Sequence, residues 1–297
     1  MAISFQSSPL LWTRVAALVF TCITFSVAVH GGWLYYGTGD WCIFCWAFSF
    51  AGTLLILLVE LFGVQSHVLI SWKNFPITFA CYAALLCLSA SIIFPMDYLK
   101  GTTIFALSET NGCRIISTIF SCFATIAYMV EVRISKARPG IVTGYMATAP
   151  GLLKICQTFS AAIIFFFISD PILYDRFEAL SYCMAVYCFC FIVSTGIIIV
   201  CVCECTGRLP FSFSRFLWGY TILSVLLYLS VVILWIIYNF DPRNGGERER
   251  PSSCRYGPGV CSWDKRMAVA VLTVLNFVLY VADLIYSARV FFVSSEN

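Results

Sequence analysis

The string LLCLS occupies Leu85–Ser89, and the closely similar string LLYLS occupies Leu226–Ser230, 141 positions further along the chain. A second pair of patterns behaves in the same way, because Tyr128-x-x-Glu131 returns as Tyr280-x-x-Asp283 at an offset of 152. All four patterns lie in long apolar runs, and the members of each pair fall in opposite halves of the chain. The sequence therefore indicates an internal duplication.

Two further matches extend the duplication over the remaining runs. Leu10-Leu11 opens the first run and Leu152-Leu153 the fifth, at an offset of 142, while Glu60 and Glu204 close the second and sixth runs at an offset of 144. Offsets that stay between 141 and 152 across four successive runs need only modest loop insertions. The pattern predicts two copies of a unit that contains four apolar runs.

Composition places these runs in a membrane. Hydrophobic residues make up 61% of the 297 residues, charged residues 11%, and the mean hydropathy is +0.90, which leaves too little polar surface to coat a soluble protein. A bilayer core of about 30 Å requires about 20 apolar residues per helix, and helices satisfy their own backbone groups in lipid. The sequence offers eight such stretches, at Val15–Tyr36, Trp41–Phe62, Phe75–Phe94, Cys113–Val132, Gly151–Ser169, Ala179–Cys203, Leu217–Phe240 and Met267–Phe292.

We therefore predict an all-α membrane protein with a tandem pair of four-helix bundles. The expected bundles cover residues 15–148 and 149–292, and residues 1–14 and 293–297 are expected to form short cytosolic tails. With cytosolic termini, nine basic residues face the cytosol, namely Arg14, Lys73, Arg133, Lys136, Arg138, Lys154, Arg208, Arg215 and Arg289. The loop at residues 241–266 makes the count equal on the two sides, but short loops and the first helices usually dominate insertion, so we predict cytosolic termini.

Four acidic residues fall toward the cytosolic ends of the predicted helices, namely Glu60, Glu131, Glu204 and Asp283. A carboxylate inside a membrane helix costs about 2.5–3.5 kcal/mol, so it needs a partner or water. One interpretation is a proton or cation relay built from the equivalent pair Glu131 and Asp283. The other is structural, with bonds to hydroxyls such as Ser135 and Ser287 or to nearby basic residues. The structural interpretation is favoured, because helices broken by Gly or Pro at the midplane are absent from the pattern.

Two groups of the sixteen cysteines stand out by position. Cys254 and Cys261 share the most polar loop, where an external location predicts a disulfide between them. Cys201, Cys203 and Cys205 form the string CVCEC at the predicted cytosolic end of the sixth run, which is typical of reversible palmitoylation sites. The alternative for CVCEC is three small apolar residues at a helix end.

No enzymatic signature is present in the chain. His30 and His67 are the two histidines, and neither belongs to a metal-binding or nucleophile motif; GxSxG, P-loop and dinucleotide-binding patterns are also absent. We therefore predict a protein that is not an enzyme and that uses no cofactor, no metal and no nucleic-acid partner.

Four segments of the sequence resemble the myeloid-associated differentiation marker family. They are SWKNFPITFACYAALLCLSASIIFP at Ser71–Pro95, EVRISKARPGIVTGYMATAPGLLK at Glu131–Lys154, CSWDKRMAVAVLT at Cys261–Thr273 and YVADLIYSA at Tyr280–Ala288. The resemblance covers nearly the whole chain from about Leu10 onward. It implies two MARVEL domains, each a four-helix membrane bundle.

The resemblance also implies a class of role without a reaction. It suggests a non-enzymatic protein that organises cholesterol-rich membrane microdomains, vesicle trafficking or the apposition of membranes at cell junctions. The expected partners are membrane lipids including cholesterol, other membrane proteins and further copies of the same chain. The expected location is the plasma membrane or trafficking vesicles. The alternative function is a transporter or channel that uses Glu131 and Asp283.

Overall fold

The computed structural model describes residues 9–32, 37–67, 70–99, 109–136, 144–168, 174, 177–208, 210, 212–255 and 261–295. Over these ranges the chain contains helices and turns but no strand, and eight of the helices are long and apolar enough to cross a membrane. The predicted fold class, an all-α membrane protein with eight spans, is confirmed. The chain separates into two compact units, Met1–Thr148 and Ala149–Asn297.

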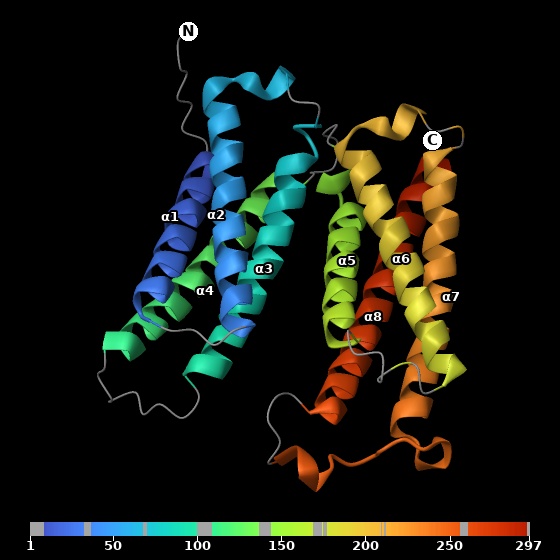
Figure 1. Cartoon of the computed structure of the whole chain (residues 1–297). Helices are drawn as coiled ribbons and strands as arrows, with labels where there is room; N and C mark the ends of the chain where they lie inside the picture. The colour runs from blue at the N-terminus through green and yellow to red at the C-terminus, as the bar shows by residue number, and fades with distance from the viewer. Residues whose placement is uncertain are drawn as a thin grey trace. The chain divides into compact units, whose positions relative to one another are not determined.

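The first unit is a ring of four helices (Figure 1). These are α1 (Pro9–His30), α2 (Thr38–Phe62), α3 (Phe75–Tyr98) and α4 (Glu109–Ser135). Helix α1 packs on α2 and α4, and α3 packs on the same two helices from the other side. Two short 3-10 helices accompany them, η1 (Val64–His67) after α2 and η2 (Tyr145–Ala147), which packs on α3.

The second unit repeats this ring (Figure 1). Its long helices are α5 (Ala149–Ile168), α6 (Glu178–Val202), α7 (Phe213–Phe240) and α8 (Ser262–Ser295). Helix α5 packs on α6 and α8, and α7 packs on both from the other side. Short 3-10 helices follow α6 (η4, Cys205–Arg208) and lie between α7 and α8 (η5, Pro242–Asn244, and η6, Ser252–Arg255). In both units, the first and fourth helices of the ring make the most extensive contact.

Several helix ends differ from the sequence-based prediction. Helix α1 begins at Pro9, so residues 9–14, which we placed in the N-terminal tail, are helical. Helix α8 extends to Ser295, into the predicted C-terminal tail. The third predicted run ends at Phe94, but α3 continues through Pro95 to Tyr98. A proline near a helix end removes only one backbone hydrogen bond, so α3 tolerates it there.

Small side chains allow α3 to approach its neighbours closely. Ala83, Cys87 and Ala90 are fully buried, and Ser91 bonds across to Ser121 of α4 at an O···O distance of 2.7 Å. Close backbone approach and hydroxyl bonds between helices are the interactions that hold membrane bundles together. Helix α3 is accordingly the most buried span of the first unit.

The segment that leads into the second unit is anchored on the first. Asn74, just before α3, accepts a hydrogen bond through its Oδ1 from the backbone N–H of Met146 at 3.1 Å, and Met146 is fully buried. Gly144 lies so close to the Asn74 amide that a Cβ atom there would sit 1.9 Å from Oδ1. The first unit therefore includes η2, and the second begins immediately afterwards at Ala149.

Candidate functional site: a buried ion cluster in each bundle

A buried guanidinium joins three helices of the first unit. Arg14 of α1 is only 3% exposed, and its Nε donates to Glu131 Oε1 of α4 at 2.5 Å, while its Nη1 donates to Glu60 Oε1 of α2. Glu131 is equally buried, at 2% exposure. A forked guanidinium suits this arrangement because its donors can serve two carboxylates at once. We call Arg14, Glu60 and Glu131 the Arg14 cluster.

The Arg14 cluster reaches the surface through one of its members. The Glu60 side chain is 26% exposed, and the same Oε1 atom that meets Arg14 also accepts a bond from the indole Nε1 of Trp72 at 3.2 Å. Glu60 lies two residues before the end of α2, and Trp72 lies between α2 and α3. The cluster is therefore at the end of the bundle where α1 begins and where α2 and α4 end.

A buried ammonium occupies the corresponding place in the second unit. Lys154 is the sixth residue of α5, as Arg14 is the sixth of α1. Its Nζ lies 2.8 Å from Asp283 Oδ2 of α8, and both side chains are excluded from the surface. The same Asp283 oxygen accepts a bond from Gln157 Nε2 at 3.2 Å, and Ser287 Oγ donates to Oδ1 at 3.4 Å. We call Lys154, Gln157 and Asp283 the Lys154 cluster.

Aromatic rings complete the surroundings of Lys154. Its Nζ lies 4.7 Å from the ring centroid of Tyr220 on α7 and 5.3 Å from that of Tyr280 on α8. A cation at this distance from a tyrosine ring is attracted by the negative ring face, by more when water is excluded. The ammonium is therefore stabilised by one carboxylate and two rings, whereas the guanidinium of Arg14 is stabilised by two carboxylates.

Polar side chains continue inward from each cluster. In the first unit the Tyr128 hydroxyl lies 2.7 Å from Thr53 Oγ1, and the next bond joins Trp46 Nε1 to Ser121 Oγ at 2.8 Å. The second unit carries a longer series along α8. Its hydroxyl and amide contacts are Tyr280 with Ser194 at 3.2 Å, Tyr228 with Asn276 at 2.8 Å and Tyr187 with Thr273 at 2.6 Å. The bundle interiors are therefore not uniformly apolar, because hydrogen-bonded polar side chains run through the apolar core.

The four predicted acids separate into three environments. Glu131 and Asp283 are buried and ion-paired, as the structural interpretation requires, and Glu60 is half-buried and paired. Glu204 lies two residues beyond the end of α6 and is exposed, with a left-handed backbone (φ 51°) that is unusual for a residue with a side chain. The Lys154 cluster therefore has no counterpart of Glu60, although Glu204 is the residue equivalent to Glu60 in the sequence repeat.

Sequence reasoning missed the two cations. The sequence-based count places Arg14 and Lys154 on the cytosolic side, Arg14 just before the first predicted span and Lys154 inside the fifth, and it assigns neither a partner in its bundle. The signal that identifies Lys154 is the polar face it forms with Gln157 and Thr158, at helical spacing inside an apolar run. Arg14 carries a weaker signal, because the predicted span began one residue after it. Removing these two paired cations weakens the charge asymmetry that supported cytosolic termini.

Within each cluster, buried charges of opposite sign lie side by side. Each acid that lies inside a bundle has a cation within its own unit, and within the described ranges no three His, Cys, Asp or Glu side chains come together as metal ligands. When all carboxylates are ionised, the Lys154 cluster is formally neutral and the Arg14 cluster carries one net negative charge. Glu60, one of the two carboxylates that produce this net charge, is partly exposed.

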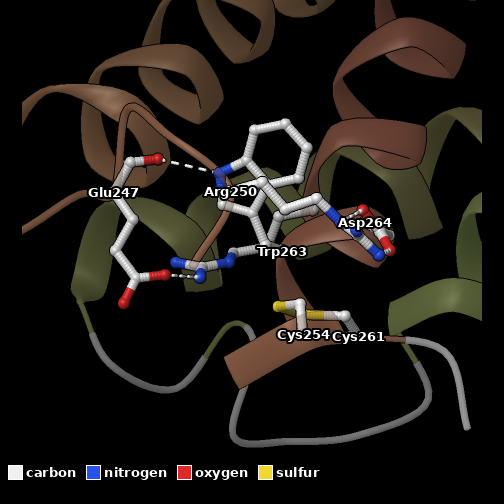
Figure 2. The surroundings of a disulfide bond; sticks show 7 residues. Glu247, Arg250, Cys254, Cys261, Trp263 and Asp264 are labelled. Carbon is white, nitrogen blue, oxygen red and sulfur yellow. Dashed lines mark hydrogen bonds and ion pairs between the residues drawn. A yellow bond between two sulfur atoms is a disulfide. The ribbon is translucent and has the colours of Figure 1, made fainter. Parts of the chain in front are cut away.

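The described part of the connection between α7 and α8, residues 241–255 and 261, forms a second site (Figure 2). Cys254 and Cys261 are joined by a disulfide with a Cα–Cα distance of 5.4 Å. The guanidinium of Arg250 makes two parallel bonds to the Asp264 carboxylate, at 2.9 and 2.7 Å. This pairing raises the pKa of Arg250 through the hydrogen bonds and charge of Asp264.

Glu247 ties the same connection to both helices. Its backbone carbonyl accepts from Trp263 Nε1 at 3.0 Å, and its carboxylate accepts from Arg266 Nη2 of α8 at 2.7 Å (Figure 2). Its backbone N–H donates to the carbonyl of Asn239, near the end of α7, at 3.1 Å. The connection is thus fixed by one disulfide, two ion pairs and backbone bonds.

The CVCEC segment lies at the end of α6. Cys201 is buried at 2% exposure, Cys203 is exposed just after the last residue of the helix, and Cys205 in η4 is half-buried. The three cysteines are therefore not equivalent, and Cys203 is the most accessible thiol of the three.

Comparisons with known proteins agree with this architecture. A profile of the MARVEL membrane-associating domain matches residues 5–133 and again residues 145–286. The chain is 54% identical to the myeloid-associated differentiation marker homolog of Xenopus laevis, over 97% of this chain and 94% of that protein. It is 50% identical to the human myeloid-associated differentiation marker, over 97% and 89% of the two chains, and 39% identical to the human marker-like protein 2.

No solved structure matches the chain. The two domain matches divide the sequence as the two helical units do, and the related proteins are aligned over almost their full lengths. The chain therefore belongs to the myeloid-associated differentiation marker family of multi-pass membrane proteins, with two MARVEL domains in tandem.

Proposed function

We propose that this protein is a non-enzymatic organiser of membrane microdomains, which acts in membrane trafficking or in the apposition of membranes through its lipid-facing surface. The observation that carries the proposal is that Glu131 is paired with Arg14 and Asp283 with Lys154. Because each of these buried acids is bonded to a cation of its own unit, neither is left over for a transported ion.

The outward faces of the bundles support a role at the lipid surface. Large apolar side chains are exposed on all eight spans, and they include Phe44, Phe48, Ile192, Leu226 and Val271. In a bilayer these side chains contact acyl chains or the helices of other membrane proteins. The partners that we infer are membrane lipids, with cholesterol among them, other membrane proteins and further copies of this chain.

The proposed location is the plasma membrane or trafficking vesicles, with both termini in the cytosol. This orientation places the disulfide-bonded connection between α7 and α8 outside, where oxidising conditions preserve it. It places Cys203 inside, where cytosolic acylation takes place.

Proximity labelling in intact cells tests the proposal. A labelling enzyme fused after Asn297 would biotinylate neighbouring proteins, before and after cholesterol depletion, with a single-span protein that carries the same fusion as the reference. We expect a set of membrane neighbours that differs from the reference and changes on depletion. Neighbours that match the reference and do not respond to depletion would contradict the proposal.

The alternative, transport through Glu131 and Asp283, is supported by the polar series along α8. It is tested separately by ion and proton flux in vesicles that contain the purified protein. We expect no flux above that of empty vesicles. A flux that is present with the parent protein and abolished in Lys154→Met/Asp283→Leu, which removes both charges together, would favour transport over organisation.

A further inference from the structure

The ion clusters join the two helices that close each bundle. Arg14 and Glu131 are 117 positions apart, and Gln157 and Asp283 are 126 apart, so each cluster connects the first helix of a unit to the last one synthesised. Helices α1 with α4, and α5 with α8, also make the most extensive contacts of their units. The clusters therefore lie at the contact on which closure of each ring depends.

In a duplicated chain, a helix can pair with the wrong repeat when the ring closes. Because the two units descend from the same pattern, an α1 helix has two candidate partners of similar shape, α4 and α8, and a neighbouring copy of the chain offers two more. Exchange of equivalent elements is a characteristic failure of repeat proteins. Apolar packing alone discriminates weakly between such partners, since lipid-facing and partner-facing surfaces are both apolar.

The two clusters are chemically different, so an exchanged helix pair would lose contacts that the correct pair makes. Arg14 uses two nitrogens for two carboxylates on two helices, while Lys154 uses one nitrogen for one carboxylate and rests against Tyr220 and Tyr280. If α1 closed against α8, Arg14 would lose Glu131, and Lys154 would lose Asp283. Closing α5 against α4 would leave Lys154 without its Asp283 and Tyr280 contacts.

We propose that the Arg14 and Lys154 clusters are helix-pairing determinants, through which the first helix of each unit selects its own fourth helix. They keep the two repeats from exchanging helices, within one chain or between two copies. Buried polar groups are best attested in this capacity, as devices that fix pairing and register at some cost in stability.

A role in selecting the partner helix differs from simple stabilisation in one measurable way, which is how often α1 pairs with the correct helix. Phe20 of α1 faces α4, with ring centroids 5.9 Å from Phe120 and 5.7 Å from Phe123. The photo-crosslinking residue benzoylphenylalanine in place of Phe20, in the full-length chain expressed in membranes, reports which helix lies beside α1. Peptide mapping distinguishes α4 from α8, and the molecular mass of the product distinguishes one chain from two.

The informative variant is Arg14→Met/Glu131→Leu, which removes the fully buried pair; the charge that remains, on Glu60, is partly exposed and still accepts a hydrogen bond from Trp72. Replacing a buried ion pair with apolar residues is often neutral for stability, so we expect the thermal midpoint to stay close to that of the parent. Crosslinks to α8 or to a second chain should rise about tenfold or more, the change that accompanies each ~1.4 kcal/mol of lost discrimination. The control is Arg248→Met/Glu249→Leu, the same chemical change at two exposed positions, and it should leave the crosslinks unchanged.

A variant that keeps its thermal midpoint and pairs as faithfully as the parent would overturn the proposal. If the midpoint falls strongly, the second unit decides. There, benzoylphenylalanine replaces Leu279, whose carbonyl accepts from Gln157 of α5 at 3.4 Å. Asp283→Lys should shift the crosslinks of this residue from α5 to other helices. Lys154→Asp/Asp283→Lys, which restores opposite charges, should restore the crosslinks to α5. Absence of that return would also refute the pairing role.

Discussion

The ammonium of Lys154 lies 2.8 Å from Asp283 Oδ2, in an interior that excludes both side chains from the surface. At such a site the contribution of the pair to stability is small, because desolvation of the two charges offsets much of their attraction. Loss of one partner is costly, because it leaves the other charge buried alone.

The first prediction concerns this asymmetry. Asp283→Asn should destabilise the protein by about 3–5 kcal/mol, since Lys154 would be left buried without a counter-ion. Lys154→Met/Asp283→Leu should be far milder. Thermal unfolding of the purified protein in detergent, followed by circular dichroism, measures both. Equal losses in the two variants would show that the pair itself, and not the stranded charge, supplies the stability.

The second prediction concerns the anchor that precedes the second unit. Gly144→Ala should destabilise the first unit, because the added Cβ would meet Asn74 Oδ1 at 1.9 Å and displace it from the Met146 N–H. Gly112→Ala is the matched control, because Gly112 lies inside α4 and the new Cβ would meet nothing within 4 Å beyond the adjacent backbone of its own helix. There the same change should stabilise by about 0.5–1 kcal/mol through helix propensity. Unfolding midpoints of the two variants that shift in the same direction would contradict this account.

The third prediction joins topology to the α7–α8 connection. If this connection is extracellular, a membrane-impermeant maleimide added to live cells should label Cys254 and Cys261 only after mild reduction. Cys254→Ser/Cys261→Ser serves as the control, because it removes both thiols and leaves the fourteen other cysteines in place. Labelling that appears only after the cells are permeabilised would reverse the proposed orientation.

The fourth prediction concerns acylation of the CVCEC segment. Palmitate incorporation, measured by acyl exchange, should fall in Cys203→Ser and stay unchanged in Cys201→Ser, because Cys203 is exposed and Cys201 is buried. A loss confined to Cys201→Ser would mean that α6 ends differently in the cell, and no change in either variant or in Cys205→Ser would remove the modification from the proposal.

The sequence alone predicted the eight spans and the four acids, because hydropathy and internal repetition report on single helices. It also placed Glu131 and Asp283 at equivalent positions. It did not reveal that Arg14 and Lys154 lie beside these acids. The partners are more than a hundred positions apart, and residue spacing along one helix does not show which other helix packs against it. Basic residues near a span end are usually solvated, so a count by position assigned both to water. Nor did the repeat show that Glu204 falls outside α6, because α6 ends at Val202 and Glu204 itself adopts a left-handed backbone.

The bonds around Glu247 and the Cys254–Cys261 disulfide have a mechanical consequence for the second bundle. They hold the facing ends of α7 and α8 together, so separation of these two helices would have to begin at their opposite ends. Toward those ends, Lys154 of α5 lies beside Tyr220 on one helix and Tyr280 on the other. A single side chain from a third helix thus contacts both helices on the side that the connection does not hold.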